Sequence, residues 1–168
     1  MRISTFVIRV WRFLSMLLAV GAVGFSYLVL PTDVGVHFDS AGKADEFMSK
    51  NDIFYFALAI VIVNNVLIMA LAKKILTLPS HLLPIPNQAE WSAHREEFNM
   101  HLKSWFYCLI ASINTIFGFM LLALGTVNSN QFKFKLSDFS WLFYMTIVML
   151  LIVGIALPVR LMMKPNEE

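Results

Sequence analysis

The chain has 168 residues, of which 58% are hydrophobic and only 14% are charged. A soluble domain has roughly 45–50% apolar and about 25% charged residues, so this chain carries too little charge for a water-exposed surface. The net charge of +2 and the scattered basic residues exclude a nucleic-acid surface. The single cysteine, Cys108, excludes an internal disulfide and any metal or redox motif that needs a cysteine pair.

Four apolar stretches are long enough to cross a bilayer. Crossing about 30 Å of hydrocarbon takes roughly 20 residues as a helix, and lipid satisfies no open backbone groups. We therefore predict an all-α membrane protein, a bundle of four transmembrane helices in which residues 1–168 form a single domain in contact with the lipid bilayer. The predicted spans are residues 13–30, 53–72, 105–127 and 139–159, with the first ending at Pro31 and the fourth near Pro158 and Arg160.

The distribution of Lys and Arg predicts the orientation. Basic residues flank the chain start, the loop between the second and third spans, and the chain end, which places these segments inside. They are Arg2, Arg9, Arg12, Lys73, Lys74, Arg95, Lys103, Arg160 and Lys164. The loop from Pro31 to Asp52 has more acidic than basic residues and is predicted outside. Both termini are therefore expected in the cytoplasm.

The loop after the first span carries hairpin signals. Residues 34–38 alternate like a strand, and residues 40–43 have turn chemistry, which predicts a short extracytoplasmic hairpin-like cap. We expect Gly42 to supply a positive φ at the turn. His37 beside Asp39 and Asp45 indicates either a hydrogen-bond staple, a pH-sensitive cluster or a cation site; we favour the staple and predict no metal. Residues 132–136 also alternate and are predicted to pair with this loop.

The same loop resembles a bacterial membrane family, the domain of unknown function 1648, represented by the amino-terminal part of Sdp-type immunity proteins. The resemblance is carried by Leu30-Pro31, Val36-His37-Phe38, Gly42, Asp45 and Ser49-Lys50, and then by Ile85-Pro86-Asn87, Glu90-Trp91 and Arg95. It covers roughly the first 125 residues and implies a multi-pass protein of the bacterial inner membrane. The larger relatives bind an exported toxin and signal to a repressor, and the resemblance implies a related role. The outer-loop candidates are Pro31, His37, Phe38, Gly42, Asp45, Ser49 and Lys50.

The inner loop predicts a long third helix that extends into the cytoplasm. Asn87 with Glu90 is spaced like a capping box, and residues 88–124 contain no Pro, which favours one continuous helix. Trp91 and Phe98 share a helical face, and with Asn87 and Arg95 they form a candidate partner surface. Packing of this face in the protein's own core is the equal alternative. Further along, Glu97 and His101 can share a metal, although a solvated charged face is the simpler interpretation.

Polar residues also occur inside the predicted spans. Asn64 and Asn65 lie in the second span and Asn114 in the third, where interhelical hydrogen bonds explain them. The centres of the spans contain no ionisable residues, which argues against a proton relay or an ion pump. In the first span, Gly21 with Gly24 and Ala19 with Ala22 predict close approach of a neighbouring helix.

These observations favour a non-enzyme without cofactors, because no phosphate loop and no activated nucleophile can be recognised. The first hypothesis is an immunity-like or sensor-like membrane protein whose outer loop recognises a ligand or partner. The alternative is an accessory subunit that stabilises a larger respiratory or transport complex through its helices; a transporter or enzyme component is third. Either of the first two implies a membrane-protein partner or self-association.

Overall fold

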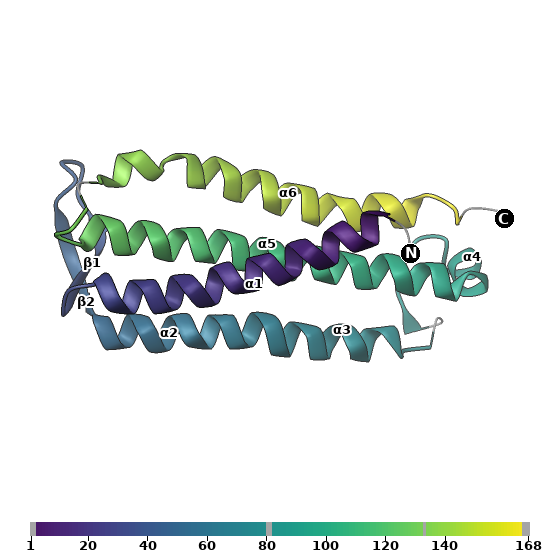
Figure 1. The fold of residues 1–168 in the computed structure, drawn as a ribbon. Helices are drawn as coiled ribbons and strands as arrows, with labels where there is room; N and C mark the ends of the chain where they lie inside the picture. The colour runs from purple at the N-terminus through teal and green to yellow at the C-terminus, as the bar shows by residue number, and fades with distance from the viewer. Residues whose placement is uncertain (1–2, 80–81, 133, 166–168) are drawn as a thin grey trace.

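The computed structural model describes residues 3–79, 82–132 and 134–165, and it is a bundle of long helices in which consecutive spans run antiparallel (Figure 1). Within these residues, four helical segments are long and apolar enough to cross a membrane: Thr5–Val29, Lys50–Leu76, Arg95–Asn128 and Leu136–Met162. Each is longer than the predicted span that it overlaps. The prediction of four apolar helices that can span a membrane is therefore confirmed, while their orientation stays a prediction.

Helices α1 (Ile3–Val29) and α5 (Arg95–Asn128) pack most closely. A Cβ added at Gly118 of α5 would lie 2.8 Å from Cγ of Leu18, so the missing side chain is what permits this approach. On α1 the contact is made by Ala19 and Ala22, both almost completely buried. Gly21 and Gly24 take no part in this contact, because nothing in the described structure lies within 4 Å of a Cβ built at either; close approach of another protein to their exposed face stays a prediction.

The second span contains a local widening of the helix. It consists of α2 (Lys50–Ile62), a π-helical turn at Val63–Leu67, and α3 (Ile68–Leu76). Single π turns inside α-helices often mark functional positions. Here the turn contains Asn64 and Asn65, which both bond to α5. The π turn thus lies where two consecutive polar side chains meet one neighbouring helix.

The prediction of one continuous third helix is wrong. α4 (Gln88–Ala93) is separated from α5 by His94, whose φ of −109° and ψ of 45° lie outside helical values. Asn87 adopts the left-handed conformation and makes no side-chain cap, so the capping-box prediction is wrong too. Its side-chain amide instead donates to the Met162 carbonyl at 3.0 Å. The break turns α4 so that the chain end after α6 can pack on it.

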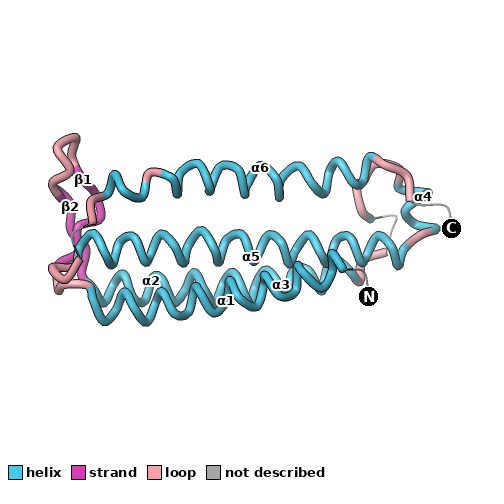
Figure 2. Tube along the Cα trace, turned by 45° about the horizontal axis from the view of Figure 1, so that its top comes forward, coloured by secondary structure: helices cyan, strands magenta, loops and turns pink. Residues whose placement is uncertain are grey.

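Helix α6 (Trp141–Met162) lies on the side of α5 away from α2 and α3 (Figures 1 and 2). Trp105 of α5 donates its indole N–H to the Val153 carbonyl at 2.7 Å, which ties the two helices together. The fourth span was expected to end near Pro158 and Arg160, and α6 continues through this proline to Met162. Proline removes a hydrogen bond to the carbonyl four residues earlier, and that residue is Gly154, which has no side chain to crowd an adjusted backbone.

The loop after α1 folds as a β-hairpin (Figure 2). β1 (Asp33–Phe38) and β2 (Ala44–Ser49) pair antiparallel, with Val34 opposite Met48 and register shifts around His37. Gly42 has a φ of +77°, as predicted for the turn. The predicted third strand is wrong: no described residue of segment 132–136 is a strand, and Leu136–Phe139 forms a 3-10 turn. Lys133 lies outside the described residues.

Candidate functional site

The hairpin is fixed to the end of the bundle by Asn128, the last residue of α5. Its side-chain oxygen accepts from the Gly35 N–H at 2.7 Å, and its amide donates to the Gly35 carbonyl at 3.0 Å. Val34 beside it is fully buried against Leu30 and Ile53. A polar and an apolar attachment therefore hold β1 in one position. Sequence reasoning missed Asn128, although an amide at the end of a long apolar helix is a usable signal.

Gly35 has no room for a side chain. A Cβ there would lie 2.6 Å from Cβ of Ala44 and 3.2 Å from Oδ1 of Asn128. We expect Gly35→Ala to lower stability by about 1–3 kcal/mol, because overpacking forces backbone shifts, and Ala44→Gly to recover part of that loss. Thermal unfolding in detergent measures both. Gly24→Ala is the matched control, since its Cβ meets nothing within 4 Å; equal melting of Gly35→Ala and Gly24→Ala would contradict the close contact.

His37 and Asp45 form an exposed pair across the hairpin. Nδ1 of His37 lies 2.5 Å from Oδ1 of Asp45. This hydrogen bond, and next the charge of Asp45, raise the pKa of His37 above its ordinary value of 6.5. The geometry corresponds to the staple interpretation. Within the described residues, no group of three His, Cys, Asp or Glu side chains is arranged to hold a metal.

The His37–Asp45 pair predicts a pH dependence of the hairpin. Because the pKa of His37 is raised in the folded state, its stabilising effect is complete below about pH 6.5 and is lost as pH rises through the higher folded value. An NMR titration of the His37 ring in micelles checks this. We expect Asp45→Asn to return the pKa toward 6.5 and Glu46→Gln to lower it less, since Glu46 acts only by a weaker charge effect. An unchanged titration in Asp45→Asn would sink the pairing.

Four other outer-loop candidates have local structural contacts. Ser49 accepts a hydrogen bond from the Asp52 N–H at 3.1 Å and so caps α2. Lys50 places its ammonium 4.8 Å from the centre of the Tyr27 ring. Pro31 follows the end of α1, and Gly42 makes the turn. These contacts shape the loop and leave His37 and Phe38 as the candidates that face open space.

That space is a cavity of about 600 Å³ between the hairpin, α5 and the start of α6. Its wall is mostly apolar, with a few polar groups from the hairpin and from α6. The lining residues are Val36, His37, Phe38, Met120, Ala123, Leu124, Val127, Leu136, Phe139, Ser140, Leu142, Phe143 and Thr146. Its volume falls within the range of about 300–1,000 Å³ typical of ligand sites. On the hairpin, Phe47 and Met48 add exposed apolar surface.

The candidate surface at the other end of the bundle is mostly internal. Trp91 is 1% exposed and Phe98 is 2% exposed, so the predicted partner surface is wrong for both and core packing holds. Asn87 bonds to the end of α6, as described above. Arg95 donates to the carbonyls of Leu76 and Leu78 at 3.0 and 2.8 Å, closing the end of α3.

An ion-pair cluster that the sequence did not reveal lies beside Trp91. Arg160 of α6 donates to Glu97 at 2.8 Å and to Nε2 of His101 at 3.2 Å, with its guanidinium 4.8 Å from the Trp91 ring centre. Nε2 of His101 also lies 3.3 Å from Oε1 of Glu97, and these side chains are only 27% and 16% exposed, so the solvated charged face favoured from the sequence is wrong for them. Arg160 already supplies a positive charge to this pair, which disfavours the metal interpretation.

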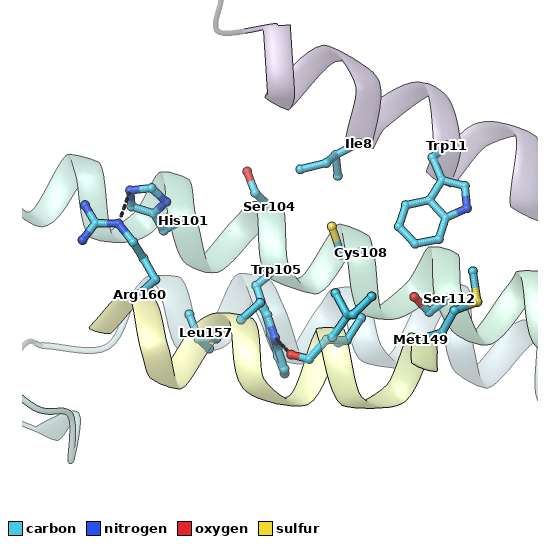
Figure 3. Close-up of a pocket in the computed structure, with 13 residues that line it drawn as sticks. Ile8, Trp11, His101, Ser104, Trp105, Cys108, Ser112, Met149, Leu157 and Arg160 are labelled. Atoms are coloured by element: carbon cyan, nitrogen blue, oxygen red, sulfur yellow. Dashed lines mark hydrogen bonds between the residues drawn. The ribbon is translucent and has the colours of Figure 1, made fainter. Parts of the chain in front are cut away.

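A second cavity, of about 430 Å³, lies between α1, α5 and α6 (Figure 3). Figure 3 shows His101 and Arg160 at one end of its wall and Ser112 at the other, with Trp105 and Cys108 between them. Ser112 is fully buried, and its Oγ has no hydrogen-bond partner among the described residues. The wall is therefore mostly apolar, with polar groups at its two ends and the Ser104 hydroxyl between them.

The three intramembrane asparagines meet, as their positions in the spans indicated. Asn64 donates to Oδ1 of Asn114 at 2.8 Å, and Asn65 exchanges two hydrogen bonds of 3.0 Å with Asn114. Asn64 also donates to the Ile110 carbonyl at 3.0 Å. These bonds join the second span to α5 and leave Oδ1 of Asn64 without a partner among the described residues. The cluster is a polar contact inside the bundle.

The architecture is that of a small multi-helix protein of the membrane, with a hairpin fixed at one end and a cavity beside it. A family model described as "Domain of unknown function (DUF1648)" matches residues 14–63. The chain resembles this family from within α1 to the start of the π turn, and the match includes every outer-loop candidate. Asn114, Asn128 and Arg160 lie outside it. No curated protein and no solved structure matches the chain.

Proposed function

We propose that this chain is a non-catalytic, immunity-like or sensor-like protein of the bacterial inner membrane, with both termini inside, and that it recognises an exported apolar peptide segment at the hairpin. The observation that supports this most is the cavity of about 600 Å³ that the hairpin closes against α5 and α6. The resemblance to the family of unknown function includes the hairpin, which makes this loop the natural place for a role shared with relatives.

The chemistry of the cavity favours an apolar peptide as ligand. Leu124, Phe139 and Phe143 supply an aliphatic and aromatic wall, while Ser140 and the ring nitrogen of His37 that is not paired with Asp45 offer polar groups that can bond a peptide backbone. Because Asn128 and Val34 hold β1 against the bundle, the wall is formed before a ligand arrives, which lowers the entropic penalty of binding. A non-catalytic role is supported by the polar groups themselves: the pairs His37–Asp45 and Glu97–Arg160 already satisfy one another.

Photo-crosslinking in the native membrane tests the proposal. A benzoylphenylalanine residue is placed at Val36 or Phe143, on opposite walls of the cavity, and at Leu28 as the control, because Leu28 is 81% exposed on α1. We expect one peptide adduct of the same mass at both cavity positions, absent at Leu28, and lost when Phe38→Asp places a charge in the wall.

The alternative, an accessory subunit, predicts a different pattern. Adducts to a large protein at Leu28 and at the outer face of α6, together with a stable assembly in mild detergent, would favour it. The functional measurement uses a deletion strain complemented with either the wild type or the Phe38→Asp variant, and it compares how well each protects the cells. If Phe38→Asp protects cells from the parent culture's spent medium as well as the wild type does, the immunity-like role at this cavity is wrong.

A further inference from the structure

A third cavity, of about 510 Å³, lies between α1 and α5 near the end of the bundle opposite the hairpin. Three of its lining residues are cationic and three are aromatic or apolar. They are Arg9, Arg12, Phe13, Met16, Lys103 and Tyr107. This composition sets it apart from the two cavities described above, whose walls are mostly apolar. A concentration of positive charge at a cavity between membrane helices calls for a negatively charged ligand.

Two of the cations, which come from different helices, both lie near the ring of Tyr107. The guanidinium carbon of Arg12 lies 4.6 Å from the Tyr107 ring centre, and Nζ of Lys103 lies 5.9 Å from it. Like charges held on one ring repel each other, so an anion between them would relieve that repulsion. In the part of the chain that the structure describes, no carboxylate forms an ion pair with Arg12 or Lys103. Their charge is therefore not neutralised by the protein's own ion pairs.

The depth of the cluster matches that of lipid headgroups. Arg12 precedes Val29, the last residue of α1, by 17 residues, which is roughly 25 Å at ~1.5 Å per residue, close to the ~30 Å hydrocarbon thickness. Long basic side chains at such a position reach the interface. Next to the cations, Phe13 is 59% exposed and Met16 is 37% exposed. The order along α1 is thus positive charge at the edge, then apolar surface toward the centre.

We propose that Arg12 and Lys103 bind the phosphate of an anionic phospholipid whose acyl chains lie along Phe13 and Met16. A zwitterionic lipid has the same phosphate, but it also carries an ammonium group that Arg12 and Lys103 repel. The site therefore selects lipids of net negative charge. The lipid site lies at the opposite end of the bundle from the hairpin, so this proposal does not depend on the proposed peptide site.

Native mass spectrometry of the full chain in a neutral detergent tests this, with phosphatidylglycerol and phosphatidylcholine as probes. We expect one phosphatidylglycerol to be retained in preference to phosphatidylcholine. Each removed charge should weaken the preference on the order of fivefold, and Arg12→Gln with Lys103→Gln about 25-fold. Arg12→Lys with Lys103→Arg keeps both charges and should keep the preference. Lys73→Gln with Lys74→Gln is the matched control, because it removes two exposed charges from α3 and should have no effect.

Any of three results would overturn the proposal. The first is equal retention of the two lipids, and the second is equal loss of preference in the α3 control and the Arg12/Lys103 variant. The third is binding of inorganic phosphate as tightly as the lipid, which would make this a site for a soluble anion. Should the neutral variant fail to fold, the wild type still decides the matter: preference for phosphatidylglycerol must fall as salt is raised, and a preference unaffected by salt contradicts the inference.

Discussion

Trp91→Ala is expected to lower the free energy of unfolding by about 3–5 kcal/mol, the range for a large aromatic side chain removed from a core. Trp91 is 1% exposed and packs with Phe98, at 6.2 Å between ring centres. Its indole N–H donates to the Leu161 carbonyl at 3.1 Å, and Arg160 lies over its face. The Trp91 side chain therefore joins α4, α5 and the end of α6, so its removal should weaken the packing of all three helices.

Thermal unfolding in detergent measures this loss, and two variants make it specific. Trp91→Phe keeps most of the apolar surface but removes the donor to Leu161, so it should lower stability by about 1 kcal/mol. Trp141→Ala removes the same side chain from a position that is 46% exposed and should matter far less. If Trp91→Ala melts like Trp141→Ala, the indole does not hold the end of the bundle.

Asn114→Leu is the second large expected effect, a loss of about 1–3 kcal/mol. A single interhelical hydrogen bond in a membrane averages ~0.6 kcal/mol, but Asn114 serves both Asn64 and Asn65. Its removal leaves the side-chain amides of Asn64 and Asn65 short of hydrogen-bond partners where no water is present. The free-energy cost of an unsatisfied buried polar group is larger than the contribution of the lost bond.

A matched pair of variants separates lost bonding from altered packing. The triple replacement of Asn64, Asn65 and Asn114 by Leu removes every member of the cluster and should be nearer to the wild type than Asn114→Leu alone. Thr126→Val is the control, because its hydroxyl bonds only to carbonyls of its own helix. Steric-trap unfolding in bicelles provides the energies. A triple variant less stable than Asn114→Leu would show that the amides pack well rather than satisfy one another.

The hairpin shows how far local sequence signals reach. Alternation in β1 and a glycine at the turn predicted it, because strand periodicity and a φ of +77° at Gly42 are local requirements. What fixes the hairpin to the bundle was not predictable in this way. Asn128 and Gly35 are 93 residues apart, and only the return of α5 to this end brings them within 2.7 Å.

The inner end of the bundle shows the opposite outcome. Trp91 and Phe98 do meet, at 6.2 Å between ring centres, but they lie on α4 and α5 and not on one continuous helix, and the periodicity did not say what covers them. The cover is Leu161 of α6 and Leu83 of the preceding loop, which depends on the turn at His94. The ion pair of Arg160 was missed for the same reason, because it joins Arg160 to Glu97 across 63 residues of chain.

The sequence by itself determined that this protein has four apolar helices suited to a lipid environment, because the thickness of the hydrocarbon layer sets the length of a spanning helix. It also determined the hairpin turn, through residues adjacent to one another. Only the tertiary structure decided which apolar faces are core and which meet lipid, which asparagines pair, and where the cations gather on Tyr107. These contacts depend on which helices become neighbours. Lipid covers any apolar helix face equally well, so close packing and polar contacts decide which faces pack against each other.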